Sequence, residues 1–351
     1  MSRTLDARAM PSGSPRCDSW LIACLSNELR SGSPLGILLE QRALVLFRDE
    51  RGRPTALDDR CLHRNAPLSM GRVSKGRLQC AYHGWTYDAK GTVVEIPALA
   101  KLEAGESKLG ARTYPAQEKD GFVWVSLADT PSGEPLEFSH LGDRGWTSFT
   151  MKTRFRAPVD ACLENFLDCP HATFLHRYWF RAPTAKPVRA RVRTLADGVE
   201  AEFFEEPREK SLVWWLLAPR RGGMRHVDRF IAPRTSLVEY EFGNGFRYTI
   251  TSSCSAVDGG TTDVYTVISF RYPGLGWLVR LAFEPLARRI IRQDVEMLDA
   301  QYANIARFGA ARFTSTRADL LGKQISAWRD ALSQGVSPPA AGQQFDVDIR
   351  L

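Results

Sequence analysis

The chain has 351 residues, a formal net charge of +7 and 25% charged residues. This length allows a large core and about two domains. Lysine and arginine are scattered among acidic residues rather than gathered in blocks, which argues against a nucleic-acid-binding protein. No apolar run approaches the roughly 18 residues that cross a bilayer, and the N-terminus lacks a signal-peptide pattern. Seven cysteines without disulfide-like spacing fit a reducing compartment, so we expect a cytoplasmic protein that binds neither nucleic acid nor membrane.

The first third of the chain reads as short strands and turns. Residues 1–16 are rich in Ser, Pro, Arg and Gly, which predicts a disordered N-terminus. Residues 19–30 are predicted to form a short helix. From residue 36 to about 130, apolar runs alternate with turn residues, which predicts a small all-β domain. Its expected strands and hairpin lie at 43–48, 55–58, 87–94 and 121–127.

The rest of the chain mixes strands with helices. The turn-rich stretch 129–146 is the best linker, so we predict domains at 17–140 and 141–351. Strands are expected at 189–193, 201–205, 236–242, 246–254 and 262–272, with a hairpin turn at Gly243-Asn244-Gly245. Helices are expected at 275–308, bent at Pro285, and at 316–332. The fold class is therefore α+β, with an antiparallel sheet covered by helices in the second domain.

Four of the six histidines fall into two groups with metal-ligand spacing. The first group is Cys61 and His63, followed by Cys80 and His83. In an extended loop, residues i and i+2 point the same way, so Cys61 and His63 can reach one centre. Two thiolates and two imidazoles suit a [2Fe–2S] cluster with a potential of roughly −150 to +300 mV. Such a cluster would accept and pass on single electrons.

A tetrahedral zinc site uses the same residue types and is the structural alternative for the first group. Two observations weigh against zinc. The order is Cys-x-His followed by Cys-x2-His, rather than paired cysteines followed by paired histidines. The flanking segments are loops that contain Gly and Pro rather than a finger helix.

The second group is Asp168-Cys169-Pro170-His171 with His176. On a regular helix, His171 and His176 would be rotated by roughly 140°, so a shared metal requires irregular backbone between them. Two histidines and a carboxylate with open positions suit ferrous oxygen chemistry. A carboxylate is the expected third ligand, with Asp294 as the candidate and Asp160 as a weaker competitor. Asn165 is a further candidate neighbour of the metal.

Both groups resemble the Rieske non-heme iron oxygenases. The resemblance lies in residues 61–64, Cys-Leu-His-Arg, residues 80–85, Cys-Ala-Tyr-His-Gly-Trp, and residues 164–171, Glu-Asn-Phe-Leu-Asp-Cys-Pro-His. One departure is Leu62, where the family commonly has proline. The resemblance implies an N-terminal Rieske [2Fe–2S] domain and a helix-grip-like catalytic domain.

The resemblance also implies a role for each ligand. Cys61, His63, Cys80 and His83 would hold the cluster. His171, His176 and Asp294 would hold a mononuclear Fe(II). Asp168 would be the electron-transfer bridge, between an iron-ligand histidine and His83 of the partner subunit, because the family commonly forms ring-shaped trimers.

By the same resemblance, NAD(P)H electrons reach the cluster through a flavin reductase, with or without a ferredoxin, and O2 is activated at the iron. The chain length is closer to monooxygenases and demethylases without a small subunit than to dihydroxylating dioxygenases. Aromatic residues in 200–290 predict an apolar cyclic or aromatic substrate, with some of them lining its pocket and most in the core. They are Phe203, Trp214, Trp215, Phe230, Phe242 and Tyr248.

Three alternatives stay open on the sequence. The chain could be a dihydroxylating dioxygenase, a Rieske electron carrier with a non-catalytic ligand-binding domain, or a zinc-stabilised binding module. His140 and His226 have no neighbours at ligand spacing and are interpreted as structural or surface residues. Cys162 and Cys169 flank the iron segment and are interpreted as small buried thiols.

Overall fold

The computed structural model describes residues 20–179, 187–204, 212–217, 224–242, 245–272 and 274–350. They divide into two compact units, one ending at Leu136 and including Ser255–Asp258, the other formed by the rest of the chain from Glu137. The predicted disorder of 1–16 and the turn at Gly243 and Asn244 lie outside the described residues. Within the described ranges, no helix is long and apolar enough to cross a membrane.

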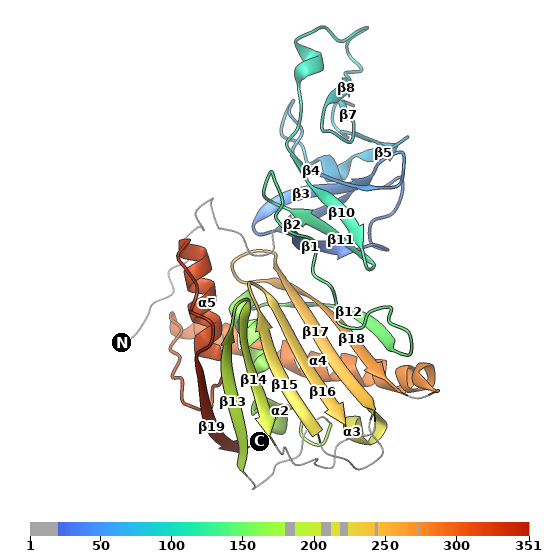
Figure 1. Cartoon of the computed structure of the whole chain (residues 1–351). Helices are drawn as coiled ribbons and strands as arrows, with labels where there is room; N and C mark the ends of the chain where they lie inside the picture. The colour runs from blue at the N-terminus through green and yellow to red at the C-terminus, as the bar shows by residue number, and fades with distance from the viewer. Residues whose placement is uncertain are drawn as a thin grey trace. The chain divides into compact units, whose positions relative to one another are not determined.

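The N-terminal unit consists of three small sheets with strand orders β1-β11-β10, β2-β3-β4-β9 and β5-β6-β7-β8 (Figure 1). This confirms the predicted all-β domain. Short 3-10 turns lie at Leu68–Met70 and Glu106–Lys108. The strands are β1 (Trp20–Leu25), β2 (Leu35–Leu39), β3 (Arg42–Arg48), β4 (Pro54–Asp58), β5 (Arg72–Ser74), β6 (Arg77–Gln79), β7 (Thr86–Tyr87), β8 (Val93–Glu95), β9 (Thr113–Tyr114), β10 (Ala116–Lys119) and β11 (Phe122–Ser126).

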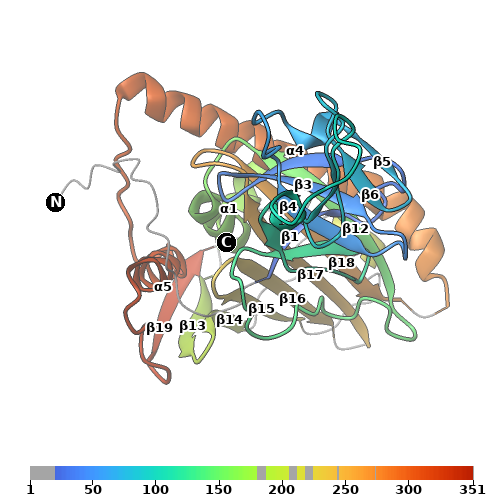
Figure 2. The same cartoon turned by 90° about the horizontal axis from the view of Figure 1, so that it is seen from above.

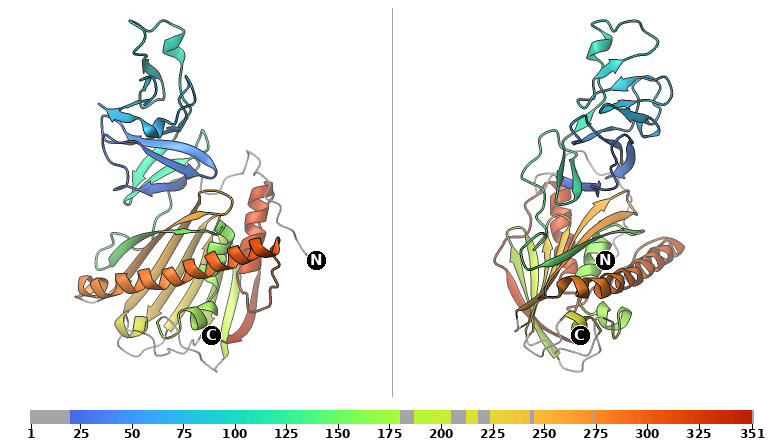
Figure 3. Two further views of the ribbon diagram at one scale, coloured as in Figure 1. Left: turned by 180° about the vertical axis from the view of Figure 1, so that it is seen from behind. Right: turned by 90° about the vertical axis from the view of Figure 1, so that its right-hand side faces the viewer.

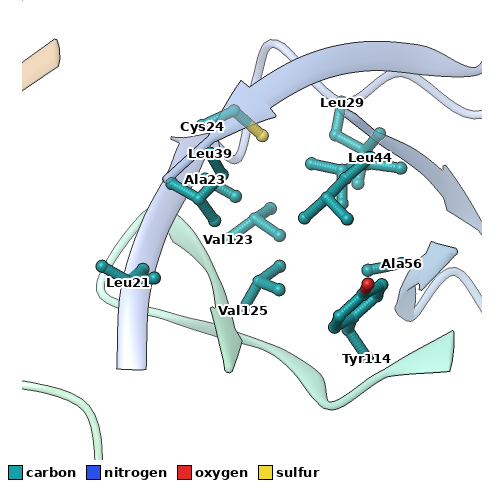
Figure 4. Packing of buried hydrophobic residues seen from close by; sticks show 11 residues of the cluster. Leu21, Ala23, Cys24, Leu29, Leu39, Leu44, Ala56, Tyr114, Val123 and Val125 are labelled. Carbon is teal, nitrogen blue, oxygen red and sulfur yellow. The ribbon is translucent and has the colours of Figure 1, made fainter. Parts of the chain in front are cut away.

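The helix predicted at 19–30 is wrong, because Trp20–Leu25 is strand β1, antiparallel to β11. Five consecutive side chains of β1 are buried, so no polar helix face exists. Leu21 and Ala23 pack with Val123 and Val125 in one apolar cluster, which Figure 4 shows from close by. Pairing with β11 and burial in this cluster therefore override the local pattern of the segment.

The C-terminal unit is built on an eight-stranded sheet with the order β12-β18-β17-β16-β15-β14-β13-β19. Neighbouring strands pair antiparallel, as in β12 with β18 and β15 with β16, and helices accompany the sheet, which confirms the α+β class. β12, β15 and β19 were not predicted as strands. The strands are β12 (Thr147–Phe155), β13 (Pro187–Leu195), β14 (Gly198–Phe204), β15 (Met224–Ile231), β16 (Thr235–Phe242), β17 (Phe246–Ala256), β18 (Thr262–Arg271) and β19 (Gln344–Arg350).

The long helix α4 (Gly276–Phe308) lies across one face of this sheet (Figure 3). Phe283 anchors it, since its ring lies 5.9 Å from Phe149, 5.5 Å from Tyr248 and 6.0 Å from Phe270, all edge to face. These contacts fix which residues of α4 point at the sheet. α4 begins and ends close to the predicted bounds and contains Pro285.

The remaining helices are α1 (Val159–Leu167), α2 (His171–Leu175), α3 (Leu212–Leu217) and α5 (Gly322–Gln334). α5 packs against α1 and β14 near the β13–β19 edge of the sheet (Figure 2). It begins six residues later than the predicted start at 316, because the backbone N–H and hydroxyl of Thr316 both bond to Asp319 in a turn. The segments α1 and α2 carry the first part of the second ligand group.

Candidate metal centres

The two ligand loops of the N-terminal unit share one backbone pattern. In each loop, the cysteine N–H donates to the carbonyl five residues later, at 2.9 Å for both Cys61 and Cys80. The cysteine carbonyl accepts from the N–H of the fourth residue, at 2.9 Å from Asn65 and 3.1 Å from Gly84. Both fourth residues have a positive φ, 60° and 75°, which asparagine and glycine tolerate best. Each loop is therefore a locally closed turn around its ligands.

These turns bring the four predicted cluster residues together as two pairs. The thiols of Cys61 and Cys80 are both buried. The rings of His63 and His83 lie 4.6 Å apart, with His83 exposed. Burial, with a smaller contribution from Cys61, raises the pKa of the Cys80 thiol. A thiol pair beside an imidazole pair is the donor set of a Rieske cluster.

Two further observations fit a [2Fe–2S] cluster better than one zinc ion. Nδ1 of His63 is buried and has no hydrogen-bond partner among the described residues, as expected of an atom reserved for a metal. A single zinc would draw all four ligand atoms to within about 4 Å of one another. Among the described residues, the groups whose ligand atoms all lie within 4.8 Å do not include these four.

Hydrogen bonds reach the cysteine sulfurs from nearby groups. Tyr87 lies 3.2 Å from Sγ of Cys61, and the Leu62 N–H donates to the Tyr87 hydroxyl oxygen at 3.0 Å. A cysteine thiolate that holds the cluster carries no proton, so with the cluster bound the Tyr87 hydroxyl is the donor to Sγ of Cys61. Burial raises the pKa of Tyr87, which keeps the proton in place. Trp85 stacks on His63 at 4.9 Å, so it packs beside the ligands. A role for Tyr87 was not predicted from the sequence.

In the C-terminal unit, His171, His176 and Asp294 converge. Nε2 of His176 lies 3.1 Å from Asp294 Oδ1, and Nε2 of His171 lies 3.5 Å from the same oxygen. The three ligand atoms lie within 4.8 Å of one another. His171 begins α2, and His176 leaves the helical conformation with φ −106° and ψ 30°. This is the irregular backbone that the five-residue spacing requires.

The two imidazoles are held at their outer nitrogens. Nδ1 of His171 donates to the backbone carbonyl of Asp168, and Nδ1 of His176 donates to Gln293 Oε1 at 2.9 Å. With Nδ1 protonated, Nε2 of each ring is left to bind a metal. Gln293 was not predicted, because its role depends on how α4 packs rather than on a local motif. The donor set therefore fits a mononuclear iron with two imidazoles and one carboxylate.

The charges of this site are coupled. Burial alone would raise the pKa of Asp294, but its hydrogen bonds to His171 and His176 outweigh burial and lower it. Burial would lower the pKa of His171, but Asp294 outweighs that effect and raises it. Asp294 is therefore anionic and available as a ligand.

Asp168 caps the end of α1 with extended backbone. Its carboxylate lies 3.9 Å from His171 Nδ1, beyond hydrogen-bonding distance, and its backbone carbonyl makes the hydrogen bond instead. The predicted contact with a ligand histidine is thus made by the main chain. Burial raises the pKa of Asp168, with His171 opposing.

The structure distinguishes the remaining candidate residues by their distance from the two iron-site histidines and by their partners. Asp160 is paired with Arg329 and is not near the two histidines. Asn165 donates to Asp294 Oδ1 at 3.5 Å, so it lies beside the candidate iron ligands. His140 stacks on Trp146 and bonds to Asp143, which agrees with a structural role. Cys162 and Cys169 are buried thiols, as predicted.

A cavity of about 120 Å³ opens beside His171, His176 and Asp294. Of the six aromatic residues considered for the pocket, only Tyr248 lines it among those described. Phe203, Phe230 and Phe242 are buried elsewhere, Trp215 is 71% exposed, and the side chain of Trp214 is outside the described residues. The apolar wall comes instead from helices and from strands of the sheet: Met151, Phe166, Ala172, Val238, Ile250, Ile268, Phe283, Ala287, Ile290 and Ile291.

The cavity wall also includes Asp228, which forms a buried pair with His226 just behind the wall, and this pair was not predicted from the sequence. His226 and Asp228 are both buried on β15 and are bonded to each other. The signal was their i, i+2 spacing, which puts both side chains on one face of a strand. The signal was unused because β15 itself was not predicted.

Two family models match the chain. The Rieske [2Fe-2S] domain matches residues 19–115, and the vanillate O-demethylase oxygenase C-terminal domain matches residues 155–334, half of the chain. The chain belongs to the Rieske oxygenase family. This confirms the resemblance seen in the motifs and assigns to this chain a [2Fe–2S] cluster and a mononuclear iron.

Individual relatives agree. Vanillate O-demethylase oxygenase subunit from Pseudomonas sp. (strain ATCC 19151) is 28% identical over 290 residues, 75% of this chain and 85% of the relative. The oxygenase subunit of 3-chlorobenzoate-3,4-dioxygenase from Comamonas testosteroni is 33% identical over 48% of this chain. That match covers only 40% of the relative, and several other curated relatives are matched over less than half of their length.

The fold also matches solved structures. Dicamba monooxygenase bound to dicamba aligns with a TM-score of 0.75 at 21% identity, over 92% of this chain and 98% of that chain. NdmA of Pseudomonas putida CBB5 with caffeine aligns with a TM-score of 0.71 at 23% identity, over 90% of both chains. At these identities the comparison establishes the shared fold.

Proposed function

We propose that this protein is an oxygenase that hydroxylates or demethylates one position of an apolar cyclic small molecule. The observation that carries the proposal is the meeting of His171, His176 and Asp294 at the wall of a largely apolar cavity. When bound, the cluster supplies single electrons and the ferrous iron supplies a site for O2 activation. Relatives named as a demethylase and a monooxygenase favour single-site oxidation over ring dihydroxylation.

The residues of this chain prepare the site in three ways. Gln293 and the Asp168 carbonyl orient the two imidazoles so that Nε2 of each faces Asp294. The apolar wall excludes water and binds the ring of the substrate. Asn165 bonds to the carboxylate of Asp294 and restricts its rotation. Cys61, His63, Cys80 and His83 hold the cluster in the other unit.

Electrons enter through the N-terminal unit in this proposal. His83 is exposed and Tyr82, whose ring lies 3.9 Å from it, is 65% exposed, so a ferredoxin or flavin reductase can approach closely. NAD(P)H is the source of these electrons. The protein works as a homotrimer in the cytoplasm, in which Asp168 links the iron site to His83 of the partner subunit.

The test is NAD(P)H-driven turnover of the purified protein with a surrogate reductase across a panel of small aromatic compounds. Products are identified by mass after reaction with labelled O2. A dihydroxylated ring carries two labelled oxygen atoms and a hydroxylated product carries one, whereas demethylation leaves the label in the formaldehyde that is released. About three irons per chain with a Rieske absorption spectrum are expected. About two irons and no product would identify an electron carrier, and zinc alone would identify a binding module.

A further inference from the structure

Besides Asp294, the cavity wall contains a second buried carboxylate, that of Asp228, which lies within 4.8 Å of ligand atoms of Cys169 and His226. Asp228 lines the cavity together with His171, His176 and Asp294. It is 3% exposed, and its Oδ1 lies 2.9 Å from Nε2 of His226, which is fully buried. A carboxylate can only accept hydrogen bonds, so Nε2 of His226 is the donor. Burying a carboxylate costs free energy unless hydrogen-bond donors compensate it, so a carboxylate at the wall of a cavity indicates a site for a donor.

His226 is held in place by rings on both sides. Phe203 and Tyr240 are its cross-strand neighbours on β14 and β16. Their rings stack on the imidazole at 4.4 and 4.2 Å, with interplanar angles of 11° and 12°. The stack continues to Tyr248 on β17, 6.0 Å from Tyr240. A clamped imidazole keeps its Nε2–H directed at Asp228 and so fixes the orientation of the carboxylate.

A carboxylate offers about four acceptor positions, of which His226 occupies one. The surrounding wall is mostly apolar, so the Asp228 carboxylate has a large effect on ligand affinity. A ligand that donates a hydrogen bond to it gains affinity, and a ligand that cannot donate loses affinity. The described residues that line the cavity include neither lysine nor arginine. A ligand carboxylate near Asp228 would therefore meet a like charge, and the wall offers no lysine or arginine to pair with it; the iron held by His171, His176 and Asp294 would be the remaining cation.

We propose that Asp228, positioned by His226, anchors a hydrogen-bond donor on the substrate ring. The substrate class is an apolar ring that carries a hydroxyl or amino group, and ring carboxylates are rejected. This inference rests on the proposed function only in placing the substrate in this cavity. Asp228 is the specificity-determining residue, and His226 is a positioning residue that acts through it.

The first test uses the wild-type holoenzyme and needs no turnover. Calorimetry would compare matched ring compounds: 4-methoxyphenol, 4-methoxyaniline, 4-methylanisole and 4-methoxybenzoate. Because a hydrogen bond to a charged group is among the stronger kinds, we expect the phenol and the aniline to bind about tenfold or more tighter than 4-methylanisole. We expect 4-methoxybenzoate to bind most weakly. Equal affinities, absence of binding by the two donor compounds, or tightest binding of the benzoate would each overturn the proposal.

The second test uses variants. Asp228→Asn keeps the size of the side chain but removes the charge, and should bring the preference for 4-methoxyphenol over 4-methylanisole close to one while easing rejection of the benzoate. His226→Gln should lower the affinity for 4-methoxyphenol more than the affinity for 4-methylanisole, whereas a general loss of structure would lower both alike. The matched control is Asp263→Asn, a buried carboxylate paired with Arg154 outside the cavity, and it should keep the full preference.

These outcomes are distinguishable from failure of the proposed function. Iron content and product formation report on the oxygenase, whereas the calorimetric preference reports on Asp228. A protein with three irons and product formation but no donor preference would overturn the anchor alone. A donor preference without product would retain the anchor and overturn the oxygenase.

Discussion

The cluster ligands lie between residues 61 and 83, whereas the candidate iron ligands come from α2 and from α4, more than a hundred residues later. Each cluster loop closes with its own hydrogen bonds and one residue at positive φ. The iron ligands meet only because α4 packs on the sheet, through the contacts of Phe283 with Phe149 and Tyr248. The electron-carrying site is therefore specified locally, while the oxygen site depends on the packing of a whole unit.

The largest expected effect comes from removing the distant carboxylate. Asp294→Asn replaces an anionic ligand by a weakly coordinating amide, so iron should fall from about three to about two per chain and turnover should be lost. The cluster absorption should not change, because its loops are independent of α4. Metal analysis and the visible spectrum check both points. Glu296→Gln, which changes an exposed carboxylate on the same helix, is the control and should retain all iron. Loss of the cluster in Asp294→Asn would contradict the view that the cluster site is independent of α4.

The next effect concerns the link between the two sites. Asp168→Asn should keep both metals but lower product formed per NAD(P)H, with turnover reduced about 10- to 100-fold, because its carboxylate is proposed to carry the coupling while its carbonyl holds His171. Product and NAD(P)H consumption are measured together. Asp160→Asn, on α1 and paired with Arg329, is the control. Full coupled activity in Asp168→Asn would contradict the bridging role.

Gln293→Leu should weaken iron binding without removing a ligand. It leaves the Nδ1–H of His176 without its acceptor, and losing such an orienting hydrogen bond typically lowers metal affinity about 10- to 100-fold. Retention of iron during dialysis against a chelator measures the effect. Gln293→Glu restores an acceptor and should restore iron retention. Gln301→Leu, which changes an exposed residue on the same helix, should retain as much iron as the wild type. Unchanged retention in Gln293→Leu would show that packing alone orients His176.

The smallest effect is expected at the cluster. Tyr87→Phe removes a hydrogen bond to the Cys61 sulfur that favours the more negative reduced cluster. Loss of roughly 1 kcal/mol corresponds to ~40 mV for one electron, so the reduction potential should fall by about that amount. Redox titration followed by absorption measures it. Tyr82→Phe is the control, because Tyr82 reaches the Cys80 sulfur through its backbone N–H. A rise in potential in Tyr87→Phe would contradict this assignment of the hydrogen bond.

Much of the fold was predicted from the spacing of apolar residues along the sequence. Several strands of the sheet and the long helix α4 were predicted because their apolar patterns extend over many residues. Trp20–Leu25 was misassigned because an apolar run without polar alternation reads equally as helix or buried strand, and only the pairing with β11 decides. β15 was not predicted as a strand because charged residues interrupt its apolar pattern. The pairing of His226 with Asp228 on that strand was therefore not predicted either.

By itself, the sequence determined that this protein carries two ligand groups of different chemistry, because cysteine and histidine at short spacing are rare and the turns that present them are local. Only the tertiary structure decided that Asp294 rather than Asp160 lies beside His171 and His176, that Gln293 orients His176, and that Asp228 faces the cavity. Those choices depend on which faces of distant helices and strands pack together, and packing is a property of the whole core rather than of any segment.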